Sequence, residues 1–195
     1  SRLAYDACLY NSQNFGFIRL PDEYTTGSSI MPHKKNPDVF ELTRAKCNRL
    51  QALPSQITLI ANNLPSGYFR DMQLIKEAFL PAFDELKEIL DMTEAMLSKI
   101  EVRTDIADDE RYRLMFSVEE VNRLTRGGMP FRDAYKKVGL DIEAGRFEPH
   151  KHVEHTHAGS IGNLCNDRIA GLFERTFADF RFEDYHRAVD NLLAE

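Results

Sequence analysis

The stretch NPDVFELTRAKCNRLQALPSQITLIANNL, residues 36–64, decides the fold class. Its apolar or stem-burying positions alternate in steps of four and three residues, the period of a helix packed nearly parallel to another helix. These positions are Lys46, Leu50, Leu53, Ile57, Ile60 and Leu64. We expect Asn36 to cap this helix and Pro37 to occupy its first position. Pro54 removes one helical hydrogen bond, which predicts a kink.

A second stretch shows the same alternation for more than three heptads. It comprises Met72, Lys76, Phe79, Phe83, Leu86, Leu90, Thr93, Leu97 and Ile100. A cluster of turn-forming residues, Asn62–Gly67, interrupts both patterns. The sequence therefore predicts two long antiparallel helices. We expect Pro81 to delay the start of the second one.

After Val102 the segments become shorter. Residues 105–110 form an acidic run typical of a helix start, and Ser117–Glu120 fits the capping-box pattern. Two glycines at 127–128, followed by Pro130, predict the end of one helix and the start of the next.

Two further helices are expected over Phe131–Val138 and Phe182–Leu193, with a loop over residues 150–167. No stretch shows the alternation of a β-strand. The predicted fold class is all-α, a long-helix bundle portion followed by a small helical carboxyl-terminal domain. We place these domains at residues 1–102 and 103–195.

Composition excludes several classes of protein. Hydrophobic residues make up 43% and charged residues 29% of the 195 positions, which fits a packed globular chain rather than a disordered one. The formal net charge is 25 − 31 = −6, without a basic block, which argues against a nucleic-acid or anionic-membrane surface. Apolar runs are far shorter than the roughly 20 residues that cross a bilayer, so we expect a soluble protein.

Cysteine usage favours a reducing compartment. Cys8, Cys47 and Cys165 are odd in number and lack CxxC spacing, which is typical of free thiols in a cytoplasmic protein. The chain opens with Ser1 inside an amphipathic pattern that has no helix-start signal, and no signal peptide is apparent. We therefore expect a piece of a longer cytoplasmic protein.

The most informative segment for chemistry is Gly27–Pro37, GSSIMPHKKNP. A hydroxyl-rich loop is followed by the cationic Lys34 and then by a helix start. Backbone N–H groups, the positive end of the helix dipole and an ammonium group together suit a carboxylate or a developing oxyanion.

This segment resembles the signature G-S-S-x-M-P-x-K-x-N-P of the fumarase/aspartase superfamily at all eight fixed positions. The resemblance implies a mobile loop, residues 20–37, over an active site. It implies Ser28 as the catalytic base, Lys34 and Asn36 as groups that bind a carboxylate and stabilise the carbanion, and Ser29 as a substrate-binding residue.

Within that superfamily, residues 68–76 resemble the argininosuccinate lyase family, which has a Y-x-x-D-x-Q-x-x-K pattern after a bundle turn. The resemblance implies that Tyr68, Gln73 and Lys76 contact the substrate. Gln73 and Lys76 are three apart, so they share one face of a helix start. Two further stretches, residues 15–26 and 128–134, resemble the same family.

The family resemblance implies β-elimination of argininosuccinate to arginine and fumarate, without an organic cofactor or a metal. It also implies a homotetramer whose active sites each draw on three subunits. The superfamily's T-x-H segment lies upstream of the serine loop and is not found here; His155-Thr156-His157 lies downstream of it. We therefore expect the proton donor to lie outside this chain, and the isolated chain to be inactive.

Several alternatives remain open. His33 stands where argininosuccinate lyases commonly have Gln, and a His at this position resembles adenylosuccinate lyase, so that enzyme is the competing interpretation. The His33 side chain is equally compatible with a role in supporting the site and with a place on the loop surface. A non-catalytic lens-crystallin relative is a third interpretation. Four histidines, His150, His152, His155 and His157, form either a metal site or, as we expect, a solvated loop.

Overall fold

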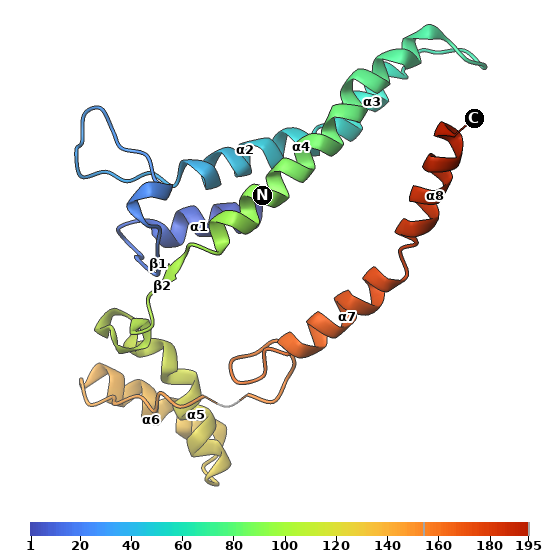
Figure 1. The fold of residues 1–195 in the computed structure, drawn as a ribbon. Coiled ribbons are helices and arrows are strands. Elements are labelled where there is room, and N and C mark those ends of the chain that lie inside the picture. Colours follow the sequence, from blue (N-terminus) through green and yellow to red (C-terminus); the bar gives the residue numbers. More distant parts are fainter. Residues whose placement is uncertain (154, 195) are drawn as a thin grey trace. The chain divides into compact units, whose positions relative to one another are not determined.

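The computed structural model describes residues 1–153 and 155–194, and helices dominate it (Figure 1). The predicted all-α class is confirmed. The chain divides into two compact units, Ser1–Asp109 and Glu110–Glu195, which we describe separately. Our assignment of residues 1–102 to a bundle portion and 103–195 to a terminal domain stays a prediction. In the described part of the chain, no helix has both the length and the apolar character that crossing a membrane requires.

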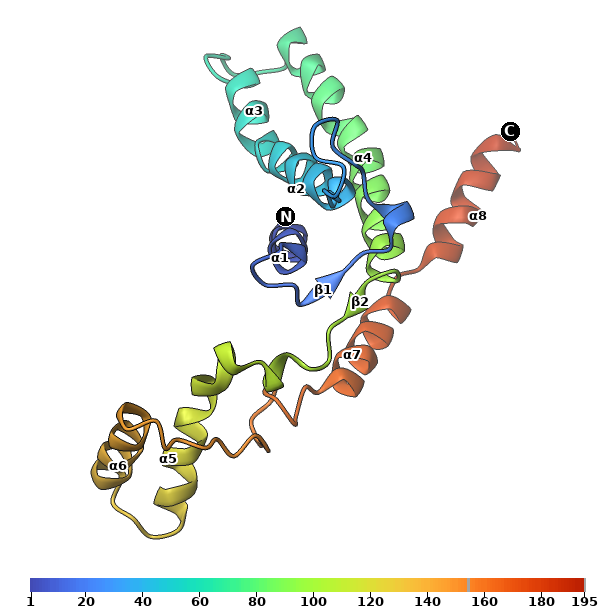
Figure 2. The same cartoon turned by 90° about the vertical axis from the view of Figure 1, so that its left-hand side faces the viewer.

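In the first unit, helices pack around one buried cluster. Helix α1 (Arg2–Asn11) contacts α2 (Asp38–Gln51), which lies beside α4 (Leu74–Leu97) (Figures 1 and 2). The buried members of the cluster are Ala4, Ala7, Leu20, Phe40 and Met96. Alanines on α1 lack long side chains, so this helix approaches α2 closely. The cluster thus joins the start of the chain to the end of α4.

The predicted helix over residues 36–64 is two helices. Helix α2 ends at Gln51, and α3 (Leu53–Ile60) follows after Ala52. Pro54 lies in the first turn of α3, where a missing backbone N–H costs nothing. The predicted kink at Pro54 is therefore wrong in form, because the proline lies at the start of a separate helix, and the predicted end at Leu64 is wrong by four residues.

Helix α4 continues a short 3₁₀ helix, η2 (Arg70–Gln73), and runs for 24 residues with Pro81 inside it. The expectation that Pro81 delays the start is therefore wrong. Helices α2, α3 and α4 form the two antiparallel arms that the spacing predicted (Figure 1). Arg49 pairs with Glu85 across the arms.

Two very short strands, β1 (Ile18–Arg19) and β2 (Glu101–Val102), pair antiparallel in the first unit. Ile18 lies opposite Val102, and Arg19 lies opposite Glu101. Two residues per strand are too few to show an alternation, which explains why none was predicted. The 3₁₀ helices η1 (Asp22–Tyr24) and η3 (Ile106–Asp108) follow β1 and β2 respectively.

The second unit begins with a 3₁₀ helix, η4 (Glu110–Phe116), which leads directly into α5 (Ser117–Arg126). The predicted capping box is wrong, because Ser117 is already helical and the N-cap position is Phe116. A preceding helical turn leaves no extended residue at position 117 whose side chain could cap.

Helix α6 (Phe131–Glu143) begins after the turn at 127–130, as predicted, and packs on α5. Gly128 has φ of +97°, a conformation that glycine adopts without steric cost. Helix α6 continues five residues beyond its predicted end at Val138. Val138 and Phe147 are buried in one cluster with Val121 of α5, and these tertiary contacts support the last turn of α6. The buried residues of this cluster are Val121, Ala134, Val138 and Phe147.

Helix α8 (Phe182–Leu193) has the predicted bounds, whereas α7 (Asn166–Ala178) was not predicted. Residues 150–153 and 155–165 lack helix, so the predicted loop is confirmed there, whereas residues 166–167 already belong to α7 and that end of the prediction is wrong. Residue 154 lies outside the described residues. Neither α7 nor α8 has a buried residue. Cys165, with φ of +62°, precedes α7 and gives no sequence signal of a helix start.

Candidate active site

Both ends of the predicted catalytic loop are anchored in the buried cluster of the first unit. Leu20, the first residue of the loop, is 2% exposed, and Phe40 after the loop is 0% exposed. Residues 29–35 between them are all exposed. The loop therefore projects from a fixed frame at the start of α2 (Figure 1).

Asn36 closes the base of the loop. Its backbone N–H donates to the Thr26 carbonyl at 2.8 Å, and the Thr26 N–H donates to the Asn36 carbonyl at 3.1 Å. The Asn36 side-chain amide donates to the carbonyls of Thr26 and Gly27 at 3.3 and 3.4 Å. The expected capping of α2 is therefore wrong: this amide is used across the loop, and Pro37 takes the N-cap position before Asp38.

The hydroxyl of Ser28 accepts two backbone hydrogen bonds. Ile30 and Met31 donate their N–H groups to Ser28 Oγ at 3.3 and 3.2 Å. Hydrogen bonds to an oxygen favour its deprotonated form, because a negative oxygen accepts them more strongly. A serine hydroxyl is a weak base by itself, so this local arrangement is the one expected for a serine that has to lose its proton.

The remaining predicted groups of this loop face solvent. Ser29, His33 and Lys34 are exposed. Lys34 is fixed through its backbone, whose N–H donates to the Met31 carbonyl at 3.0 Å. Among the described residues, none pairs with the Lys34 ammonium group. A cationic group without a protein partner is available to a carboxylate ligand.

The neighbouring Lys35 is engaged instead. Its ammonium group pairs with Asp22, which holds the pKa of that carboxyl below its ordinary value of 3.8. Asp22 also lies 3.7 Å from Arg19 Nη2. This pair connects the end of the loop to the turn at its start, and it was not predicted. The sequence indicates this pair only through an acid, Asp22, and a lysine, Lys35, on opposite sides of Gly27.

The second set of predicted residues lies in the segment that joins α3 to α4. Tyr68 is 68% exposed, and Gln73 and Lys76 are also exposed. Gln73 ends η2, and Lys76 is in the first turn of α4. In the described part of the chain, the side chains of these three residues have no hydrogen-bond or ionic partner.

The structure does not bring the two sets together. The Ser28 loop precedes α2, whereas Tyr68 follows α3, so the two sets lie at opposite ends of the antiparallel arms (Figure 1). A helical path over residues 38–60 spans about 30 Å. One copy of this chain therefore does not form a single site from both sets.

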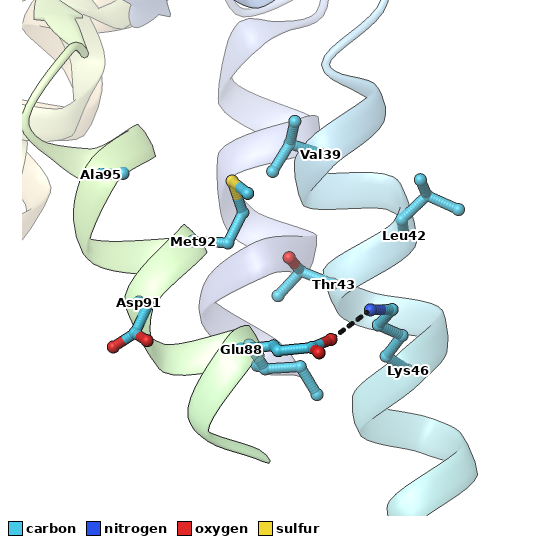
Figure 3. Close-up of a pocket in the computed structure, with 9 residues that line it drawn as sticks. Val39, Leu42, Thr43, Lys46, Glu88, Asp91, Met92 and Ala95 are labelled. Atoms are coloured by element: carbon cyan, nitrogen blue, oxygen red, sulfur yellow. Dashed lines mark hydrogen bonds and ion pairs between the residues drawn. The ribbon is translucent and has the colours of Figure 1, made fainter. Parts of the chain in front are cut away.

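A groove between two of these helices lies elsewhere. It measures about 580 Å³ and lies between α2 and α4 (Figure 3). Lys46 Nζ lies 3.5 Å from Glu88 Oε2 across it. Its lining comprises Val39, Leu42, Thr43, Lys46, Glu88, Ile89, Asp91, Met92 and Ala95. None of the predicted site residues lines this groove.

The histidine cluster does not converge. The rings of His155 and His157 stack at 5.3 Å, and His155 Nε2 lies 3.0 Å from Glu119 Oε1. Within residues 1–153 and 155–194, no three His, Cys, Asp or Glu side chains are placed to hold a metal ion. The three cysteines are free, and burial raises the pKa of the Cys8 thiol.

Comparison with known proteins shows what the chain is similar to. Residues 1–52 match a family model described as lyase. The chain is 68% identical over 193 residues to argininosuccinate lyase from Bacteroides fragilis, and 66% identical to that from Parabacteroides distasonis. Each alignment covers 99% of this chain and 43% of the relative.

A more distant relative, argininosuccinate lyase from Stenotrophomonas maltophilia, is 41% identical over 176 residues. That alignment covers 89% of this chain and 41% of the relative. The chain thus spans less than half the length of the curated relatives that it matches. The resemblance predicted from the Ser28 and Tyr68 segments is confirmed.

Proposed function

Since the chain is related over almost its whole length to part of the argininosuccinate lyases, we propose that it is the carboxyl-terminal part of such an enzyme. The activity is β-elimination of argininosuccinate to arginine and fumarate. The observation that carries this proposal is the Ser28 hydroxyl, held by two N–H donors within the matching signature. The longer protein is called the full-length enzyme below.

Ser28 is the base. Its oxygen removes a proton from the carbon next to the succinyl carboxylate, and the electron pair moves into that carboxylate to give a dianionic aci-carboxylate. Lys34 and Asn36 stabilise this charge, each as an electrostatic partner of the type that is worth about 10²–10³ in rate. For this role the Asn36 amide exchanges its bonds to the Thr26 and Gly27 carbonyls for the substrate. The electron pair on the carboxylate then forms the double bond of fumarate as the guanidino nitrogen departs.

The departing nitrogen needs a proton, which a group outside this chain supplies. Ser29, Tyr68, Gln73 and Lys76 bind the substrate. No cofactor or metal takes part in the proposed reaction. Because the donor is supplied from elsewhere, the isolated chain is inactive.

The full-length enzyme is a cytoplasmic homotetramer. The separation of Ser28 from Tyr68 by the length of α2 and α3 supports an active site that draws on more than one subunit. Helix α4 supports association too, because it leaves large apolar side chains about half exposed: Phe79, Phe83, Leu86, Leu90 and Leu97. Three free thiols support the cytoplasmic location.

Association is measurable on the chain itself. We expect light scattering to give the mass of a dimer or a larger assembly, because a long apolar stripe on two helices associates in water. A clean monomer at micromolar concentration would count against the bundle placement.

Fumarate release, followed by ultraviolet absorbance, tests the proposed function. We expect the full-length enzyme to release fumarate from argininosuccinate, and the isolated chain to release none. Adenylosuccinate is the control substrate, because His33 at the loop also fits an adenylosuccinate lyase. Activity with adenylosuccinate alone would transfer the assignment to that enzyme, and inactivity with both would favour a crystallin-like structural relative.

A further inference from the structure

The catalytic loop has a narrow base that we call the neck, formed by Thr26 on one side and Asn36 and Asp38 on the other. Two backbone hydrogen bonds join Thr26 to Asn36. Side chains add two further connections, because Thr26 Oγ1 donates to Asp38 Oδ2 and the Asn36 amide donates to the Thr26 carbonyl. Residues 27–35, with Ser28, lie between the two sides of the neck.

Asp38 is well placed to hold the neck still. It is the first residue of α2, and Phe40 two residues later is fully buried. Its carboxylate is therefore attached to a rigid part of the frame. A hydrogen bond from a hydroxyl to a carboxylate is charge-assisted and about twice as strong as a neutral one.

The side-chain bond is separate from the structural needs of the helix. The N-cap position of α2 is Pro37, and no side chain caps that helix. A carboxylate in the first turn interacts favourably with the helix dipole whether or not Thr26 donates to it. The Thr26 hydroxyl thus contributes to the neck but not to the stability of α2.

We infer that Thr26 and Asp38 are positioning residues for Ser28. The inference rests on the proposed lyase function. Ser28 is two residues from Thr26, so a displacement of the neck is transmitted directly to the base and its N–H donors. A misplacement of about 1 Å costs up to about 10²-fold in rate. Loss of the connection between Thr26 and Asp38 is expected to cost about tenfold in kcat, with KM changed by less than about twofold.

The test compares variants of the full-length enzyme in fumarate release. Thr26→Val removes the hydroxyl at nearly constant volume, and Asp38→Asn removes the charge. Thr25→Val is the matched control, because the Thr25 hydroxyl donates to the Asp22 carbonyl within its own turn. Thr26→Ser keeps the hydroxyl and is expected to restore kcat to within about twofold of the parent.

A double variant distinguishes positioning from general damage. If Thr26 and Asp38 act through one hydrogen bond, the double variant loses no more kcat than the worse single variant. The melting temperature of Thr26→Val should equal that of Thr25→Val. Equal kcat for these two variants, or a loss of kcat in Thr26→Val that Thr26→Ser does not restore, would overturn the inference.

Amide hydrogen exchange on the full-length protein separates this inference from the proposed function. We expect faster exchange at the Asn36 N–H in Thr26→Val than in Thr25→Val, because that N–H bonds across the neck. Equal exchange rates at the Asn36 N–H in the two variants would overturn the inference that the Thr26 hydroxyl holds the neck. If the parent releases no fumarate, the proposed function fails, and the exchange rates still decide whether the Thr26 hydroxyl holds the loop.

Discussion

Two segments of the first unit carry the family motifs, and they differ in how much of their structure is local. The Ser28 loop has its own framework: two N–H donors to Ser28 Oγ and a hydrogen-bonded neck. The Tyr68–Lys76 segment exposes its three candidate side chains without partners among the described residues. The proposed base is therefore positioned by contacts within about ten residues of the chain. The proposed substrate contacts instead depend on parts of the protein outside the segment that carries them.

The frame under the Ser28 loop is the feature whose loss has the largest expected effect. Phe40→Ala should lower the free energy of unfolding by about 3–5 kcal/mol, because it leaves a cavity in a fully buried site. Chemical denaturation followed by circular dichroism measures this. Leu42→Ala, on the same helix but 62% exposed, is the control and should cost much less. Equal losses would show that the loop is not anchored through Phe40.

The exposed segment should respond in binding rather than in stability. In the full-length enzyme, Lys76→Met should raise KM for argininosuccinate by about tenfold or more, because it removes a charge-assisted contact to the substrate. The melting temperature should not change, since Lys76 has no described partner to lose. A lower melting temperature with unchanged KM would mean that this segment is structural.

Lys87→Met provides the control for Lys76→Met. Lys87 lies on the same helix, 75% exposed and 3.8 Å from Asp84. Its substitution removes the same charge from α4 and should leave KM unchanged.

The smallest expected effect concerns pH at the Ser28 loop. Lys35 lowers the pKa of Asp22, so the pair is intact above the ordinary value of 3.8 and is lost as pH falls through the lower folded value. Carbon-13 titration of the Asp22 carboxyl should give a midpoint below 3.8. In Lys35→Met the midpoint should rise toward that value. An unchanged midpoint would contradict the pairing of Lys35 with Asp22.

The long arms of the fold were predictable because they depend on spacing that is visible in the sequence. Helix α8 was predicted with its bounds, and Pro54 marked the break between α2 and α3. Helix α7 was missed because its start follows Cys165 in a left-handed conformation rather than a recognisable cap. The predicted helix caps at Asn36 and Ser117 were wrong. The Asn36 amide bonds across the loop, and Ser117 is already part of α5.

The site was predictable as a set of residues but not as a geometry. The signature implied Ser28, Lys34 and Asn36, yet the N–H groups of Ile30 and Met31 have no side-chain identity to read. These two donors depend on the backbone path of the loop, which no residue type in the sequence specifies. By contrast, the separation of the two motif segments was not predicted, although it is a consequence of the antiparallel arms that the spacing did predict.

The most direct test of the account is kcat for fumarate release by the full-length enzyme and its Ser28→Ala variant. We predict a loss of about 10³-fold or more, because the variant removes the base whose deprotonation the loop favours. Ser29→Ala, one residue away and exposed, should act mainly through KM. A Ser28→Ala variant that retains kcat within tenfold of the parent would contradict the assignment of Ser28 as the base.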